Sequence, residues 1–233
     1  LDLEYGKIKL VIAIPDTLRF KNFDQMVAEY AKKKKILRLS SEYLTNASKF
    51  IKSCKSYKKA FGNKDPMIIT PWLRVGTNKN VQIHLSFGAT EAKPPEDVDA
   101  IMDVTETGTT LKQNGLKIID TVMTSSAHLI ANKQSLKDKN KREKIFDIVT
   151  LMSGAVQGKK YLHLYLNIKE NNLKKLLKEL PSLKRPTVSP LSQKGWLGVN
   201  TVILKTDFHK LIPKLRKIAQ GIVVHEPRQI LQL

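Results

Sequence analysis

The chain of 233 residues has little cysteine and no long hydrophobic run. Its one cysteine, Cys54, cannot form a disulfide within the chain, and such cysteine usage suits a reducing cytoplasm. Because no histidine stands close to Cys54, we interpret it as a packed helix residue rather than a reactive thiol. No run of about eighteen apolar residues is present, so we expect neither a membrane-spanning helix nor a membrane partner. Residues 1–5 lack the features of a secretory signal, which favours a soluble, cytoplasmic protein.

Acidic residues are scarce relative to basic ones. The 41 Lys and Arg residues against 21 Asp and Glu residues give a net charge of +20. Such a field attracts polyanions, including nucleic acids and phosphorylated substrates, although a solvated lysine-rich surface gives the same composition. Aromatic residues make up only 6% of the chain, and Tyr161 and Tyr165 are the only candidates for a base-stacking pair on a strand. We therefore expect no nucleic-acid partner.

Residues 1–158 show alternating strand and helix patterns, which predict an α/β domain. Short apolar runs predict strands, and apolar residues at helical spacing predict helices. The β-branched stretch after residue 116 predicts two strands with a bend near residues 124–126. The expected strands lie in 7–15, 36–39, 67–69, 81–87, 98–104 and 117–131, and the expected helices in 23–35, 45–59, 111–116 and 139–159.

Residues 159–233 have a different pattern and form a predicted second domain. Asp207 is the expected N-cap of its last helix. The order βαββαβ is that of a ferredoxin-like fold. The expected strands are 160–168, 187–189, 196–204 and 221–225, and the expected helices are 171–180 and 207–218.

The segment from Asp103 to Thr110 carries the clearest chemical pattern. It follows an apolar strand and precedes a helix start, where backbone N–H groups can point outward and bind an anion. Gly108 permits a left-handed turn, and the threonine hydroxyls can donate to phosphate oxygens. Asp103 and Glu106 can bind ribose hydroxyls or a Mg²⁺ ion on a pyrophosphate. The pattern predicts a ribose-5-phosphate site, and the alternative is an ordinary threonine-rich turn.

Several separate motifs resemble the ATP phosphoribosyltransferases. Residues 100–117 resemble the phosphoribosyl-pyrophosphate loop of that family, and residues 125–132 are similar to the strand after it. Residues 186–191, 195–196 and 211–215 resemble the third domain of the long, hexameric, histidine-regulated form. The resemblance implies an α/β periplasmic-binding-protein-like lobe followed by an α+β ferredoxin-like (ACT-like) regulatory domain. It extends from Lys7 to the C-terminus.

The resemblance implies the first step of histidine biosynthesis, in which ribose 5-phosphate moves from phosphoribosyl pyrophosphate to N1 of ATP and pyrophosphate leaves. It implies Mg²⁺ as cofactor, histidine as feedback inhibitor and a homo-oligomer from dimer to hexamer. No catalytic acid–base pair and no protein metal ligand are assigned, because electrostatic stabilisation of the leaving pyrophosphate would dominate. The implied substrate-binding residues are Glu42, Tyr43, Asp103, Thr105, Glu106, Thr107, Gly108, Thr109 and Thr110.

A histidine-binding role in the third domain is likewise implied by the resemblance. Two departures concern that site: Asn167 stands where relatives can carry an acid for the amine of histidine, and Arg185 stands where a small residue is usual. The alternative for Leu183 and Val202 is plain hydrophobic core. The implied effector-binding residues are Asn167, Leu183, Thr187, Val202 and Gly221.

The family also has an N-terminal segment with a Gly-Arg-Leu sequence that helps to form the nucleotide site. On this interpretation the 233 residues hold an incomplete first lobe, and the alternative function is a non-catalytic, amino-acid-sensing fragment or subunit. We predict that the polypeptide alone is inactive. Release of pyrophosphate from ATP and phosphoribosyl pyrophosphate, measured with a coupled assay, would contradict this prediction.

Overall fold

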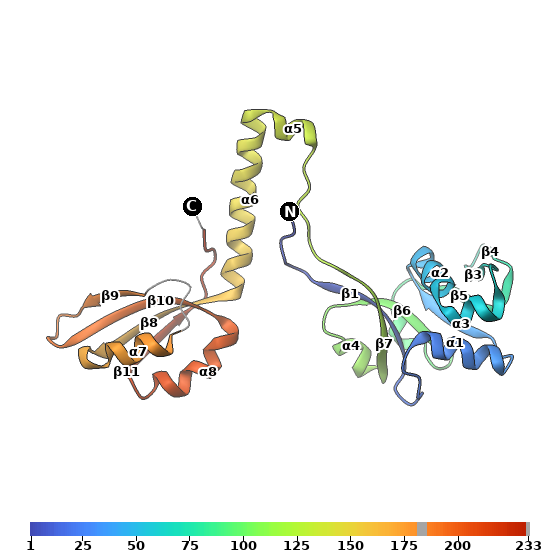
Figure 1. Cartoon of the computed structure of the whole chain (residues 1–233), viewed down its shortest axis with the longest axis horizontal. Coiled ribbons are helices and arrows are strands. Elements are labelled where there is room, and N and C mark those ends of the chain that lie inside the picture. The colour runs from blue at the N-terminus through green and yellow to red at the C-terminus, as the bar shows by residue number, and fades with distance from the viewer. Residues whose placement is uncertain (181–185, 232–233) are drawn as a thin grey trace. The chain divides into compact units, whose positions relative to one another are not determined.

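The computed structural model describes residues 1–180 and 186–231 (Figure 1). The chain divides into two compact units, one of Gly6–Ala127 and one of Leu1–Tyr5 with His128–Leu233. The expected boundary after residue 158 falls instead within the last turn of a long helix, α6 (Lys139–Lys160). In the described residues no helix is long and apolar enough to cross a membrane.

The unit Gly6–Ala127 is an α/β lobe built on a seven-stranded sheet with the order β4-β3-β5-β2-β6-β1-β7. Strands β3, β5, β2 and β6 run parallel to one another, whereas β1, β4 and β7 pair antiparallel with their neighbours. The elements are β1 (Ile8–Pro15), α1 (Phe23–Lys32), β2 (Leu37–Ser41), α2 (Leu44–Ser53), α3 (Lys55–Phe61), β3 (Pro66–Ile69), β4 (Arg74–Val75), β5 (Asn78–Leu85), the 3₁₀ turn η1 (Thr90–Ala92), β6 (Ala100–Thr105), α4 (Thr109–Gln113) and β7 (Leu116–Ser125).

Strand β1 is apolar on both faces because both faces are covered. Its residues Leu10, Ile12 and Ile14 belong to the large core cluster that includes residues of α1, α2 and α3. The intervening Val11 and Ala13 belong to a smaller cluster that includes Leu111 of α4 and Leu116 of β7. The continuous apolar run in the sequence therefore corresponds to a strand that is packed on both of its faces.

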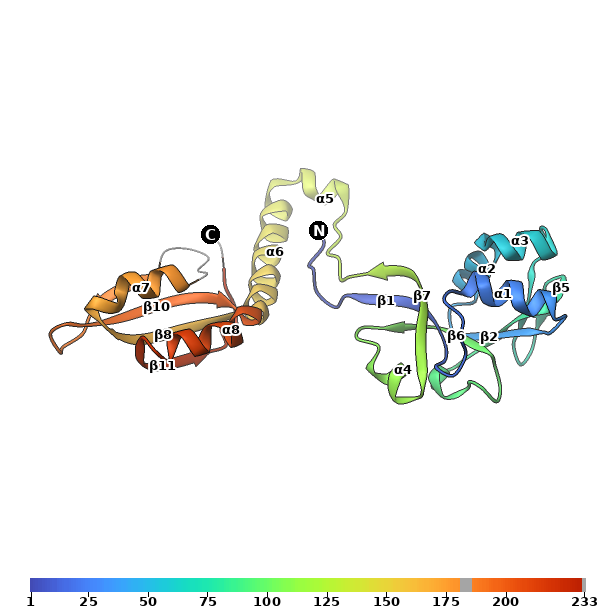
Figure 2. The ribbon, with the colours of Figure 1, turned by 60° about the horizontal axis from the view of Figure 1, so that its bottom comes forward.

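The second unit contains a four-stranded antiparallel sheet with the order β11-β8-β10-β9 (Figures 1 and 2). This order, with two helices in the βαββαβ sequence, confirms the predicted ferredoxin-like fold. Alternate residues of β8 are buried against α7 and α8 in one core. The elements are α5 (Lys133–Lys137), α6, β8 (Tyr161–Lys169), the 3₁₀ turn η2 (Glu170–Asn172), α7 (Leu173–Glu179), β9 (Thr187–Pro190), β10 (Trp196–Leu204), α8 (Lys205–Leu215) and β11 (Ala219–His225).

Two glycines of α6 form the packing surface for the last described residues of the chain. Gly154 and Gly158 are the buried residues of this helix. A methyl group on Gly158 would lie 2.6 Å from the carbonyl oxygen of Pro227, closer than atoms can approach. The backbone N–H of Ile230 donates to the carbonyl oxygen of Gly154 at 2.9 Å. The chain after β11 therefore runs directly across the helix.

Three local predictions are wrong. The helix expected over residues 45–59 is two helices, because Cys54 has an extended backbone and the Asp24 carboxylate accepts the N–H and hydroxyl of Ser56 at 2.8 and 2.7 Å. The stretch after residue 116 gives one strand, β7, rather than two. Helix α8 begins two residues before Asp207, and its N-cap is Leu204.

Burial at the break between α2 and α3 controls the chemistry of Cys54. The side chain is 8% exposed, and burial, followed by the charges of Asp24 and Asp120, raises the pKa of its thiol to about 12. Because the thiolate is the reactive form, we expect Cys54 to react with a disulfide reagent at pH 8 orders of magnitude more slowly than a free cysteine. The thiol released by denaturant is the control, and fast reaction of the folded chain would contradict the prediction.

Candidate functional site

The candidate site lies where three parallel strands end at one edge of the sheet. Arg38 of β2 and Asp99, just before β6, form two side-chain hydrogen bonds of 3.1 and 3.2 Å, and Asp99 also accepts the N–H of Arg38. With this register, Ser41 at the end of β2 is level with Met102 of β6. The N–H of Ser86, just after β5, donates to the carbonyl oxygen of Ser41 at 3.1 Å. The segments that follow β5 and β2 therefore begin side by side, and the neighbouring strand β6 continues three residues past the level of Ser41.

The loop after β6 is closed by its own threonines. Gly108 has a φ of 81°, in the left-handed region, and its N–H donates to the hydroxyl oxygen of Thr105 at 2.8 Å. The N–H of Thr109 donates to Thr107 Oγ1 at 3.3 Å, and the two hydroxyls lie 2.9 Å apart. These bonds occupy the N–H groups of Gly108 and Thr109. The expected nest of outward N–H groups is therefore not formed by these two residues. One hydroxyl of the Thr107–Thr109 pair and the exposed hydroxyl of Thr110 remain as donors.

This loop borders a cavity of about 420 Å³ that is open to solvent and lined mainly by polar residues. The predicted substrate residues Gly108 and Thr109 belong to the same loop, although they do not line the cavity. The lining residues are Glu91, Asp103, Val104, Thr105, Glu106, Thr107, Thr110 and Leu111.

Asp103 is the partly buried acid of the site. Burial raises the pKa of its carboxyl, the N–H of Val104 opposes the change with a hydrogen bond of 2.7 Å, and the charges of Glu91 and Glu42 raise the pKa further. Glu42 therefore lies within electrostatic reach of Asp103, as its place after β2 requires. Tyr43 is 37% exposed and is not among the lining residues of the cavity; its N–H donates to Ser41 Oγ.

Glu91 is the site residue that sequence reasoning missed. It lies in η1, an irregular segment between β5 and β6, so no periodic pattern marks it. Its neighbour Thr90 is 1% exposed and donates its hydroxyl to Ser86 Oγ, also buried, at 2.9 Å. This buried hydroxyl pair fixes the turn and presents Glu91 to the cavity. The sequence signal that could have identified Glu91 is an acidic residue shortly after β5, a strand that ends at the same edge of the sheet as β2.

The acids at this edge do not form a metal cage. Among residues 1–180 and 186–231, no group of three or more His, Cys, Asp or Glu side chains could hold a metal ion. Mg²⁺ in phosphoryl chemistry is commonly held by one or two carboxylates together with substrate phosphates. The residues present therefore do not fit a resident Mg²⁺ site, and any such ion would have to enter with a phosphorylated substrate.

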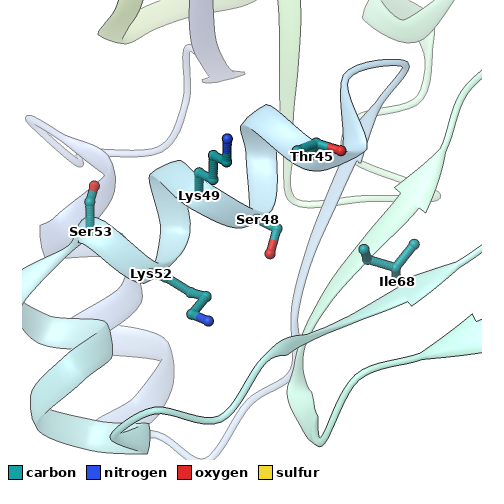
Figure 3. Close-up of a pocket in the computed structure, with 6 residues that line it drawn as sticks. All are labelled: Thr45, Ser48, Lys49, Lys52, Ser53 and Ile68. Carbon is teal, nitrogen blue, oxygen red and sulfur yellow. The ribbon is translucent and has the colours of Figure 1, made fainter.

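A larger cavity of about 540 Å³ lies elsewhere, between α2 and β3 (Figure 3). Thr45, Ser48, Lys49, Lys52 and Ser53 of α2 line it together with Ile68 of β3. Lys52 forms a 2.6 Å ion pair with Asp65. The lining contains no acid and no residue of the threonine loop, so the smaller cavity has the chemistry of the predicted site.

The predicted effector residues that the structure describes, Asn167, Thr187, Val202 and Gly221, lie on one face of the second sheet. Strand pairing places Gly221 directly opposite Asn167, and the core-facing residues of β8 alternate with Asn167 on the other face. Asn167 Oδ1 is buried and has no hydrogen-bond partner among residues 1–180 and 186–231. Val202 is opposite His163, four residues along β8 from Asn167, which is about 13 Å along a strand.

Thr187 of β9 lies opposite Asn200 of β10, on the same face as Asn167. Leu183 and Arg185 lie outside the described residues. The structure thus brings Asn167 and Gly221 together and separates Val202 from them.

Two family models match the chain. The ATP phosphoribosyltransferase model matches residues 1–154, and the model of the C-terminal domain of that family matches residues 158–227. The chain belongs to the ATP phosphoribosyltransferase family. The first match ends at residue 154 and the second begins at residue 158, both within α6.

This chain covers a different share of the length of each relative. An ATP phosphoribosyltransferase of Solibacter usitatus is 37% identical over 97% of this chain and 68% of the relative. Those of Koribacter versatilis and Chlorobium chlorochromatii are 44% and 42% identical over 61% of this chain, which covers 50% and 49% of those relatives. The chain therefore spans about half to two thirds of the relatives it matches.

Among solved structures, the chain is similar to one titled an ATP phosphoribosyl transferase (HisG:HisZ) complex from Thermotoga maritima. The identity is 19%, the TM-score is 0.41, and the match covers 64% of this chain and 56% of that chain.

The raised pKa of Asp103 predicts that its charge destabilises the fold. Because the folded state favours the protonated carboxyl, this residue contributes stability below its ordinary pKa of 3.8 and loses that contribution as pH rises through the folded value. We expect Asp103→Asn to raise the unfolding midpoint at pH 7, with a gain that shrinks as pH falls toward 4. Chemical denaturation across this range measures it. Glu106→Gln, at an exposed neighbour, is the control, and no gain for Asp103→Asn at pH 7 would disprove the charge argument.

Proposed function

We propose that this chain contains the phosphoribosyl-pyrophosphate site of an ATP phosphoribosyltransferase. The whole protein would transfer ribose 5-phosphate to N1 of ATP in the first step of histidine biosynthesis. The observation that carries the proposal is the threonine loop at residues 105–110, which borders the acid-lined cavity of about 420 Å³. Exposed hydroxyls beside half-buried acids match a ligand with a phosphate at one end and sugar hydroxyls at the other.

The residues have separate roles in this proposal. The hydroxyl of Thr110 and one hydroxyl of the Thr107–Thr109 pair donate to the 5-phosphate, while Asp103 and Glu106 accept hydrogen bonds from the ribose hydroxyls. Gly108 holds the left-handed turn that closes the loop. Glu91 lies on the cavity wall and favours a ligand whose hydroxyls face the acids.

In the reaction, the lone pair of adenine N1 forms a bond to ribose C1 while the bond from C1 to the pyrophosphate oxygen breaks. The electron pair leaves with pyrophosphate, so positive charge near the leaving group stabilises the transition state. Mg²⁺ would arrive with phosphoribosyl pyrophosphate, because the acids form no cage of their own. The net charge of +20 would also draw both anionic substrates to the protein.

We also propose that histidine regulates the enzyme through the second unit and that the active form is a homo-oligomer, from dimer to hexamer. The unpartnered Oδ1 of Asn167 supports an effector site, since it can accept a hydrogen bond from an amino group. Gly221 beside it leaves the sheet face open, because nothing lies within 4 Å of the place of its missing side chain. We propose that Thr187 and Leu183 contact the bound histidine. Val202 would lie farther from it than Asn167 and Gly221 do.

The loop's role can be tested by substitution of Thr110. Removal of one hydrogen bond to a charged phosphate costs about 1.5–3 kcal/mol, so we expect Thr110→Ala to weaken binding of Mg²⁺–phosphoribosyl pyrophosphate about 10- to 150-fold. Isothermal titration of the 233-residue chain measures this. The control is Thr124→Ala, an exposed threonine of β7 in the same unit. Equal affinity of the two variants would refute the proposal, and histidine binding without phosphoribosyl pyrophosphate binding would favour the amino-acid sensor.

A further inference from the structure

Two large aromatic side chains stand exposed beside the proposed substrate site. Trp72 and Phe87 are each 72% exposed, and their ring centroids lie 6.1 Å apart with an angle of 45° between the rings. Ile69 of β3 is level with His84 of β5, and Trp72 and Phe87 each come three residues after this level pair. The pair therefore lies at the carboxyl edge of the parallel strands, the edge that also carries the threonine loop.

The segment of Trp72 is held firmly by its backbone. The N–H of Thr70 donates to the carbonyl oxygen of Leu73, and the N–H of Leu73 donates to Thr70 Oγ1, both at 2.9 Å. At the base of this hairpin a Cβ on Gly76 would lie 2.2 Å from the carbonyl oxygen of Pro66, so the two chains are in direct contact. A ring on such a turn loses little further freedom when a ligand stacks on it.

Phe87 precedes Glu91, a residue that lines the cavity, by four positions in the chain. Ser86, the residue before it, bonds to the end of β2 and to the buried hydroxyl of Thr90, and Glu91 comes next in the chain. One anchored turn thus presents an exposed ring at its start and a cavity-lining acid at its end. Two strand spacings separate β5 from β6, which is about 10 Å. A nucleotide can span that distance.

The charge near the pair favours an anionic ligand. His84 lies next to this turn on β5, and its pKa is lowered first by burial and then by the charges of Arg38, Lys93 and Arg74, with Asp97 opposing them. Arg38 is paired with Asp99 near the start of β2, so Lys93 and Arg74 are the cations that add positive charge around His84. A protein partner is less consistent with the patch, because a stable interface uses about 20–30 residues a side. The exposed apolar residues of the hairpin and turn are only Trp72, Leu73, Val75 and Phe87.

We propose that Trp72 and Phe87 form the platform on which the purine base of ATP stacks, with its N1 directed toward the ribose held at Asp103. This inference rests on the proposed function, since it places the second substrate relative to the first. The rings are tilted, so the base lies against the outer face of one ring rather than between the two.

The fluorescence of Trp72 provides the test. The chain has two tryptophans, so Trp196→Phe leaves Trp72 as the only one. In this background we expect ATP to quench the emission and inorganic tripolyphosphate to leave it unchanged. Because each substitution removes a ring on which the base stacks, we expect Trp72→Ala and Phe87→Ala each to lower the affinity for ATP about 5- to 150-fold. Trp72→Phe should restore most of the affinity.

Matched controls separate this proposal from the previous one. Leu73→Ala and Val75→Ala remove exposed apolar side chains from the same hairpin and should leave ATP affinity unchanged. The affinity for Mg²⁺–phosphoribosyl pyrophosphate should be the same in Trp72→Ala as in the unmodified chain.

If phosphoribosyl pyrophosphate binds and ATP neither quenches Trp72 nor depends on it, the platform is refuted while the loop proposal stands. Equal quenching by tripolyphosphate also refutes stacking. Emission that changes with protein concentration but not with ATP would assign the pair to contact between copies and overturn the proposal.

Discussion

The paired hydrogen bonds between Arg38 and Asp99 set the arrangement of the whole candidate site. They fix β2 against β6, and the bond from Ser86 to Ser41 then fixes the end of β5 against β2. A shift of one residue in either pairing would turn every side chain to the opposite face. Strands β2 and β5 end level, and β6 continues three residues beyond them to the threonine loop, so the chemistry of this edge is a consequence of register.

The charges of the protein are divided in a way that suits a substrate with both phosphates and hydroxyls. The chain as a whole is strongly basic, yet Glu42 and Glu91 lie close enough to Asp103 to raise the pKa of its carboxyl further than burial does. The basic surface therefore attracts the substrate's phosphates over long distances, while the acids at the site bind its hydroxyls at short range. The cost of gathering acids at the site is the destabilisation of the ionised Asp103, which is typical of functional sites that bind ligands at the expense of fold stability.

Patterns of neighbouring residues in the sequence correctly predicted the elements whose structure depends mainly on those neighbours. The apolar run at residues 8–15 gives β1, and the acid, glycine and threonine pattern marks the loop at residues 103–110. The break at Cys54 escaped prediction because it depends on Asp24, a residue of another helix. Glu91 and the pair of Trp72 with Phe87 escaped because their positions follow from the strand order. Such order arises from long-range pairing, and a single sequence does not display it.

The close contact of the last described residues with α6 has a consequence for the second unit. Because the segment that contains Pro227 and Ile230 is covalently joined to the domain whose helix it crosses, it behaves as a tethered ligand. Its effective concentration at Gly154 and Gly158 is set by the short chain after β11 and does not fall when the protein is diluted. A free peptide of the same sequence would have to compete against that local concentration, so the surface of α6 at Gly154 and Gly158 is in practice reserved for the chain's own segment.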